Sequence, residues 1–202
     1  RLKDSAEFTV YTPGSSAGVP VSVLGSFDPP PVRDPGLLAE RAQSSVSGML
    51  ALAGVAGDSL TSPAHILLTN ILVAAWAEGV SLDLPGLIQR VQSPPLQTIG
   101  VLPIDDFLPP KDRLALAMAL NALLAAPGFA IWTQGDPLDI GAFLRTAGGK
   151  PRVSIFSIAH LDDSQRMFFV TQLLSALVGW MRAQTGTSSL RALVYMDEIF
   201  GF

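Results

Sequence analysis

The fold is decided by the stretch Arg152-Val153-Ser154-Ile155-Phe156-Ser157-Ile158 and by the helix and apolar run that come after it in the chain. The apolar, β-branched residues of this stretch are typical of a buried strand. Asp162 to Gln165 then supply side chains that suit a helix N-terminus, and the predicted helix extends to about Gln184. Leu193 to Met196 is a second apolar run. Strand, crossover helix and strand predict a parallel, right-handed βαβ unit, and therefore α/β architecture.

The helix between these two runs is apolar on nearly all of its faces. A helix with one buried side carries a single apolar stripe, so we expect this one to be covered on more than one side. Its apolar residues are Phe168, Phe169, Val170, Leu173, Leu174, Leu177, Val178 and Trp180.

The rest of the sequence divides into two regions. Residues 1–34 hold two predicted strands, Phe8 to Tyr11 and Val19 to Leu24, and a proline-rich connector. Pro20 places the second strand at a sheet edge. Residues 35–148 show helical periodicity interrupted by proline and glycine, which predicts a large helical insertion. Residues 149–202 are the C-terminal βαβ segment. The helices expected in the insertion are Leu37 to Ala53, Pro63 to about Glu78, Leu84 to Val91, and one from Pro109 to about Pro127, followed by short turns at 129–132 and 140–145.

The composition is rich in apolar residues. Hydrophobic residues make up 49% of the 202 and charged residues 15%, and the mean hydropathy is +0.40. This fits either a membrane protein or a piece of a larger protein whose apolar faces meet missing neighbours. The longest uncharged run, Leu114 to Gly135, is interrupted by Asn121, Pro127 and Gln134, and it lacks basic anchors and an aromatic belt. We therefore expect no membrane span.

The polar residues exclude several kinds of site. The sequence has no cysteine, so neither a disulfide framework nor a thiolate metal site can form. The net charge is −4 and only three lysines occur, so no basic stripe is available for a phosphate backbone. Arg1 to Glu7 is polar rather than a signal peptide, and we expect a cytoplasmic location.

The leading candidate site is the acidic pair Asp197-Glu198, which comes directly after the apolar run Leu193 to Met196. An apolar strand that ends in two carboxylates is the Walker B pattern of nucleotide hydrolases. Acids at the carboxyl end of a parallel strand face the crevice where ligands bind in open α/β sheets. The other interpretation is that a buried strand ends in charge because solvent begins there.

Gly14-Ser15-Ser16-Ala17-Gly18 matches the G-x-S-x-G motif of serine hydrolases. Ser16 would be the nucleophile, with Asp105 or Asp139 and His160 further along the chain. The motif needs a helix directly after the serine, whereas Val19-Pro20-Val21 predicts extended chain. A flexible turn is the preferred interpretation.

The other candidates are better explained by structure than by chemistry. His160 and His65 are the only histidines, too few for a metal cluster of imidazoles, and His160 is expected to hydrogen-bond near a helix start. Gly148-Gly149-Lys150 lacks the spacing of a phosphate loop and precedes a strand, so it predicts a hairpin-like turn. The pairs Asp105-Asp106 and Asp162-Asp163 are expected to be caps or solvated turns.

Three segments together resemble bacterial ATP-binding proteins of the HerA–FtsK group. They are Val10 to Gly18 (VYTPGSSAG), Lys150 to Leu161 (KPRVSIFSIAHL) and Ser188 to Gly201 (SSLRALVYMDEIFG). Members of this group are RecA-like P-loop ATPases, and many are DNA-translocating hexamers. The resemblance spans essentially the whole chain.

The resemblance implies a function for the acidic pair. Asp197 would hold Mg²⁺ through its water shell, and Glu198 would orient and deprotonate the attacking water. The Walker A motif, G-x-x-x-x-G-K-[ST], is absent from the 202 residues. The resemblance therefore implies an internal fragment of a partial RecA-like core, ending at Walker B and inactive alone. The parent would be a homo-oligomeric, Mg-ATP-driven DNA translocase, with a nuclease as a further partner. The alternative is a non-catalytic helical scaffold that contacts subunits or partners.

Overall fold

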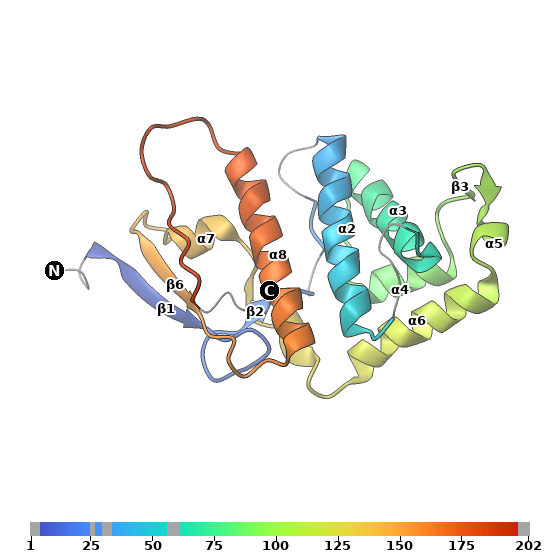
Figure 1. Ribbon diagram of the computed structural model, residues 1–202, viewed down its shortest axis with the longest axis horizontal. Helices are drawn as coiled ribbons and strands as arrows, with labels where there is room; N and C mark the ends of the chain where they lie inside the picture. Colours follow the sequence, from blue (N-terminus) through green and yellow to red (C-terminus); the bar gives the residue numbers. More distant parts are fainter. Residues whose placement is uncertain (1–4, 25–26, 30–33, 56–60, 198–202) are drawn as a thin grey trace.

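The computed structural model describes residues 5–24, 27–29, 34–55 and 61–197. It is a mixed α/β structure in which a small parallel sheet lies at one end and a group of helices at the other (Figure 1). Helix α8 (Asp163–Arg182) stands beside helix α2 (Pro35–Leu52) where the two parts meet. The expected combination of parallel strands with a helical region is confirmed at this level.

The main sheet consists of β1 (Glu7–Tyr11) and β6 (Arg152–Phe156), both of which were predicted from their apolar runs. The strands are parallel, with Glu7 opposite Arg152 and Tyr11 opposite Phe156. Because parallel strands need a long crossover, nearly the whole helical region lies between the two strands in sequence.

Four shorter strands form two further pairs. β2 (Val21–Ser22) lies parallel to β5 (Asp136–Pro137), and Val19 forms a parallel bridge with Tyr11. The second predicted strand is therefore real but short. β3 (Thr98–Ile99) and β4 (Leu102–Pro103) form an antiparallel hairpin.

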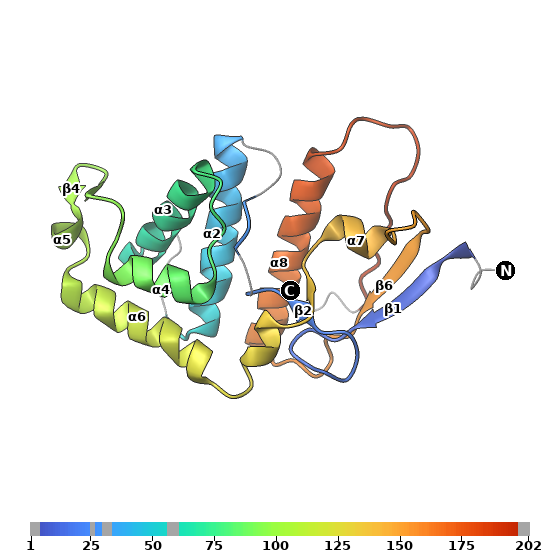
Figure 2. The same ribbon diagram turned by 180° about the vertical axis from the view of Figure 1, so that it is seen from behind.

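The two faces of the main sheet differ in their surroundings. Helices α7 (Ile140–Leu144) and α8 lie beside the main sheet (Figure 2). On this face, an aromatic cluster joins Tyr11 and Phe156 to Phe143 of α7 and to Phe169 of α8. The ring centres in this cluster lie 4.9 to 5.6 Å apart. The other face carries four exposed apolar side chains. These are Phe8, Val10, Val153 and Ile155, each between 40% and 50% exposed.

The helical part matches the sequence-based expectation closely. After α2 come α3 (Pro63–Ala77), α4 (Leu84–Gln92), α5 (Ile104–Phe107), α6 (Pro110–Ala125) and the 3₁₀ turn η1 (Ala130–Thr133). Several of these helices begin with proline in the first turn, where its missing N–H costs nothing. The Asp34 side chain accepts a hydrogen bond from the Leu37 N–H at 3.0 Å, and Asp83 caps α4 in the same way.

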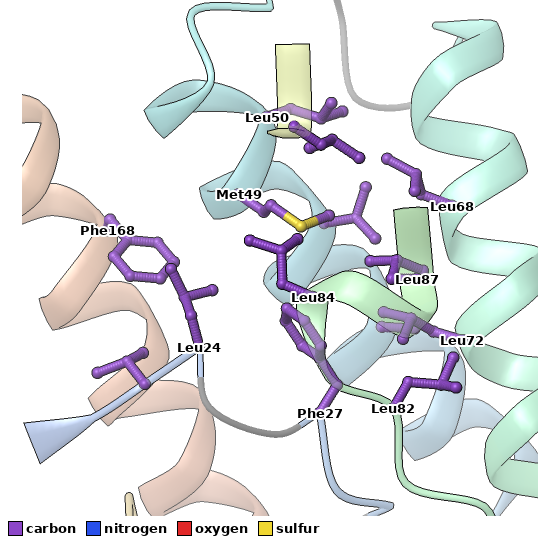
Figure 3. Close-up of a cluster of buried hydrophobic side chains, with 14 of the residues drawn as sticks. Leu24, Phe27, Met49, Leu50, Leu68, Leu72, Leu82, Leu84, Leu87 and Phe168 are labelled. Atoms are coloured by element: carbon purple, nitrogen blue, oxygen red, sulfur yellow. The ribbon is translucent and has the colours of Figure 1, made fainter. Parts of the chain in front are cut away.

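One continuous apolar core fills the space among α2, α3 and α4 and reaches α8 (Figure 3). Trp76 of α3 lies inside it, and its Nε1–H donates to the Phe27 carbonyl oxygen at 2.8 Å. That bond holds the chain before α2 against the helices. The side chains labelled in Figure 3 are Leu24, Phe27, Met49, Leu50, Leu68, Leu72, Leu82, Leu84, Leu87 and Phe168.

Helix α8 begins with a capping box, in which the Asp162 carboxylate accepts from the Gln165 N–H at 2.8 Å and the Gln165 side chain accepts from the Asp162 N–H. The helix is covered on two sides, as predicted. Phe168 packs on α2, where a Cβ added to Gly48 would lie 2.5 Å from the Phe168 ring. Phe169 packs on the sheet. A stripe formed by Met167, Leu174, Val178 and Met181 stays exposed.

The predicted second strand of the C-terminal βαβ unit is not formed. Leu193 to Met196 has no strand pairing, and Leu193 and Tyr195 are each 81% exposed. The partner of β6 is β1, from the other end of the chain, so this part of the prediction was wrong. Within the described ranges, no helix is long and apolar enough to cross a membrane.

Candidate functional site

The candidate site lies at the carboxyl ends of β1 and β6. Because these strands are parallel, the loops after them, residues 12–20 and 157–162, leave the same edge of the sheet. This edge is where open α/β sheets bind ligands.

The loop after β1 is closed by its own hydrogen bonds. Thr12 Oγ1 accepts from the Gly18 N–H at 2.9 Å and donates to the Ser15 carbonyl oxygen at 2.9 Å. The Val19 N–H donates to the Val10 carbonyl oxygen at 3.1 Å, which turns the chain back along β1. Gly14 has φ +69°, and a Cβ there would lie 2.7 Å from the Trp132 ring. A glycine is therefore required for this tight packing.

The serine-hydrolase hypothesis does not fit this geometry. Ser16 is exposed on the loop, and the chain after it leads into β2 rather than into a helix. Asp105 pairs with Arg113 at 2.8 Å, and Asp139 caps α7 by accepting from the Gly141 N–H at 2.8 Å. The segment is a glycine- and serine-rich turn, as expected.

His160 joins the two loops of the site. Its Nε2 lies 2.8 Å from the Pro13 carbonyl oxygen, and because a carbonyl only accepts, Nε2 must carry the proton. His160 is therefore hydrogen-bonded, as expected, but its partner lies in the loop after β1 rather than at the start of α8. His65 is buried between α2 and α3, where its ring contacts Ser47 Oγ at 3.0 Å and Thr69 Oγ1 at 3.4 Å. Neither histidine takes part in a group of metal-ligating side chains within the described residues.

Gly148-Gly149-Lys150 forms the expected turn before β6. The Thr146 N–H donates to the Lys150 carbonyl oxygen at 2.9 Å, and Gly149 has φ +79°. The Lys150 N–H donates to Thr146 Oγ1 rather than pointing to an open anion site. The segment leads into a strand and provides no phosphate cradle.

The acidic pair is only partly described. Asp197 is exposed and has no hydrogen bond or ion pair with another described residue, while Glu198 lies outside the described residues. A free carboxylate is a suitable ligand for Mg²⁺ or for its water shell. Met196, directly before it, packs against the apolar core. Asp197 therefore lies next to a residue anchored to the core, although not on a formed strand.

Sequence reasoning missed a polar cluster at the amino end of the sheet. Arg152 donates from Nη2 to Glu7 Oε1 at 2.7 Å and from Nη1 to the Ala142 carbonyl oxygen at 2.9 Å. The hydrogen bond to Glu7 raises the pKa of Arg152, and burial raises the pKa of the nearby Tyr11. The only signal in the sequence was a single arginine at the start of an apolar run. This cluster holds β1, β6 and α7 together.

A second missed group is Arg113 at the start of α6. It is buried, and its Nη1 donates to Asp105 Oδ1 and to the Leu108 carbonyl oxygen, both at 2.8 Å. Its Nε has no hydrogen-bond partner among the residues that the structure describes. The side chain fixes α5 onto α6, which is a structural task.

Comparisons of this chain with protein-family models, with curated proteins and with solved structures found no match.

Proposed function

We propose that this chain is part of a HerA–FtsK-like, RecA-type ATPase and carries its Walker B acids, Asp197 and Glu198. Asp197 would act on Mg²⁺ through its water shell, and Glu198 would take the proton of the attacking water. The parent protein would couple ATP hydrolysis to movement along DNA. The 202 residues lack a Walker A motif, so phosphate binding would come from another part of the parent.

The observation that carries the proposal is the parallel pairing of β1 with β6, with α8 and then the acidic pair next along the chain. Parallel pairing brings two strand ends and their loops to one edge of the sheet, and His160 and Pro13 connect those loops. The apolar run Leu193 to Met196 follows β6 along the chain and is separated from it by helix α8. This order is typical of α/β nucleotide-binding cores.

ATP hydrolysis by the full-length protein tests the proposal. We expect Mg-dependent turnover, and we expect Glu198→Gln to lower kcat by about 10²- to 10⁴-fold, the usual contribution of a general base. Asp197→Asn should instead weaken Mg²⁺ binding, so that turnover needs a higher Mg²⁺ concentration. Glu78→Gln, an exposed glutamate at the end of α3, is the matched control and should leave turnover unchanged.

The 202-residue chain alone provides the second arm of this test. It should show no turnover, because it lacks the Walker A loop and lysine that supply most phosphate contacts. Turnover by the isolated chain that disappears in Glu198→Gln would contradict the proposal that phosphate binding comes from another part of the parent protein. Full-length protein without Mg-dependent hydrolysis would refute the ATPase function itself.

The second candidate, a non-catalytic interaction scaffold, is favoured by exposed apolar surface. One face of the main sheet and the exposed stripe of α8 have no cover from described residues. Contiguous apolar patches of this kind often mark sites of protein contact. A concentration-dependent mass in light scattering that Val178→Asp abolishes, together with absent ATPase activity in the full-length protein, would favour this function.

A further inference from the structure

Helix α6 carries no charged residue after its first turn, although one of its sides is exposed to solvent. The opposite side, which includes Leu116 and Leu120, is buried, and α4 is its neighbour. Surface helices normally carry charged and polar residues on their outer side, so an apolar outer side indicates a missing neighbour. Asn121, the only polar residue between Leu114 and Ala125, lies at the border of this side. We call the apolar residues of the outer side the α6 face, and they are Leu114 (52% exposed), Met118 (65% exposed) and the exposed Ala115, Ala122 and Ala125.

The α6 face lies at the margin of the molecule. In Figure 1 and Figure 2, α6 runs along the lower edge of the helical region, and no other helix or strand is drawn beneath it. Its large and small residues are separated along the helix, because Leu114 precedes the midpoint, Met118 is near it, and Ala122 and Ala125 follow it. Two such faces fit together when they run in opposite directions, since the large residues of each then meet the small residues of the other.

The two ends of α6 are also complementary in charge. Lys111 lies three residues before Leu114, in line with the α6 face, and it forms no hydrogen bond or ion pair with another described residue. A cation is unfavourable at a helix N-terminus and favourable at a C-terminus. The last turn of α6 has no basic residue, and the carbonyl oxygens of Leu124 and Ala125 accept no hydrogen bond from the part of the chain that the structure describes. The C-terminal end therefore lacks the cation that the N-terminal end carries.

We propose that the α6 face binds the α6 face of a second copy of this chain, with the two helices antiparallel and a two-fold axis at Met118. Met118 then meets the same residue of the other copy, and Leu114 lies against Ala122 of the partner subunit. Lys111 lies beside the free carbonyl oxygens at the C-terminal end of the partner's helix. The two-fold symmetry forms each of these unlike contacts twice.

The charges favour the antiparallel pair over a parallel one. Asp106, Lys111 and Asp112 are exposed at the first end of α6, and the last turn carries no charge. A parallel pair would place the like charges of the two copies side by side, which is unfavourable. In the antiparallel pair the two charged ends are separated by the length from Lys111 to Ala125, about 21 Å at about 1.5 Å per residue, well beyond the screening length of about 8 Å in physiological salt.

The contact is small, which determines how it should behave. Each copy contributes a few side chains, whereas a standard stable interface contains about 20–30 residues a side. We therefore expect a reversible dimer whose fraction rises with protein concentration. The inference goes beyond the proposed function and does not rest on it, because the contact involves neither the acidic pair nor the exposed stripe of α8.

A single introduced cysteine tests the two-fold axis, and the chain contains no native cysteine to interfere. The test variant is Met118→Cys, since a residue on the axis lies next to its own copy. The matched control is Met181→Cys on α8, because the two methionines are similarly exposed, at 65% and 59%. With a mild oxidant, we expect Met118→Cys to form disulfide-linked dimers at least about tenfold faster than Met181→Cys, because only the dimer contact holds the two thiols at bonding distance. Equal rates, or a faster reaction of Met181→Cys, would overturn the proposal.

The mass of the unmodified chain in solution provides an independent measurement. In light scattering, the average mass should rise with concentration from 21.3 kDa toward twice that value. Met118→Lys places two ammonium groups together at the axis and should keep the chain monomeric, with an unchanged Tm because the position is exposed. Val178→Asp, on the exposed stripe of α8, should leave association unchanged. A monomer at every concentration, or association lost in Val178→Asp but kept in Met118→Lys, would overturn the proposal.

Charge reversal at Lys111 tests the antiparallel direction. Lys111→Glu should raise the dissociation constant of the dimer by about 3- to 30-fold, because a favourable charge is lost at the C-terminal end of both helices. The substitution places an acid at the N-terminus of α6, where it is favourable, so a loss of association cannot be attributed to unfolding. Lys150→Glu, an exposed lysine in the turn before β6, is the matched control. Equal dissociation constants in the two variants would overturn the antiparallel arrangement.

Discussion

Replacing Phe169 by alanine tests how α8 is held on the sheet. Phe169 is fully buried, and its ring centre lies 5.6 Å from that of Phe156. Phe156 in turn contacts Tyr11 at 5.3 Å and Phe143 at 5.1 Å. The substitution therefore leaves a cavity in the cluster that joins β1, β6, α7 and α8.

The expected cost is about 3–5 kcal/mol in the free energy of unfolding, the usual range for a buried phenylalanine truncated to alanine. The neighbours come from two strands and two helices, so they cannot easily collapse into the space. For a chain of this length, 1 kcal/mol corresponds to a Tm shift of about 2–4 °C. The predicted decrease in Tm is therefore about 6–20 °C.

Thermal unfolding followed by circular dichroism measures this decrease. The matched control is Met181→Ala on the exposed stripe of the same helix, where the side chain is 59% exposed. That change should cost no more than about 0.5 kcal/mol, as is usual for surface positions. Equal, small shifts in the two variants would refute the packing of α8 on the sheet through Phe169. If Phe169→Ala does not fold, Phe169→Leu keeps most of the volume and should fold with a smaller decrease in Tm.

Three further predictions concern local features. Gly135→Ala should cost about 1–3 kcal/mol in thermal unfolding, because Gly135 has φ +95° and a Cβ there would clash with the Pro20 carbonyl oxygen. Gly128→Ala, in open space, should be neutral. Asp162→Ala removes the cap of α8 and should lower the free energy of unfolding, measured in urea, by about 1 kcal/mol. An unchanged free energy of unfolding would contradict this prediction. Burial raises the pKa of Tyr11 above its unfolded value, so its neutral form is favoured in the folded state and the stability it contributes is lost as the pH rises past about 10. A Tm series from pH 8 to 11 should show less loss at high pH in Tyr11→Phe but not in Tyr195→Phe.

Local signals made the helices predictable from the sequence. Pro63 and Pro110 mark helix starts within a residue, and the Asp162 to Gln165 pattern forms the expected capping box. These features depend on neighbours within a few residues, so the sequence contains all the information that they need.

Partners that are distant in sequence were not predictable. The run Arg152 to Phe156 indicates a strand, but nothing in it indicates that β1 is its partner. The exposure of Leu193, Val194 and Tyr195 also depends on tertiary pairing, which propensity does not determine. An arginine in the first turn of a helix is usually exposed to solvent. Arg113 is buried because α5 lies over it, with hydrogen bonds to Asp105 and to the Leu108 carbonyl oxygen. For the site, the two glycine-rich turns are confirmed and His160 is hydrogen-bonded, although to the loop after β1. The roles of Asp197 and Glu198 stay predictions.

The pairing of β1 with β6 also has a consequence for synthesis on the ribosome. Glu7 and Arg152 are hydrogen-bonded across a separation of 145 residues. At about 5–20 residues per second, β1 would leave the ribosome about 7–30 s before its partner is made. During that time the helices α2 to α6 can fold on local contacts, while the exposed edge and the apolar residues of β1 remain open to other chains. The polar residues Glu7 and Thr9, which alternate with Phe8 and Val10, make this strand less prone to aggregate while it waits.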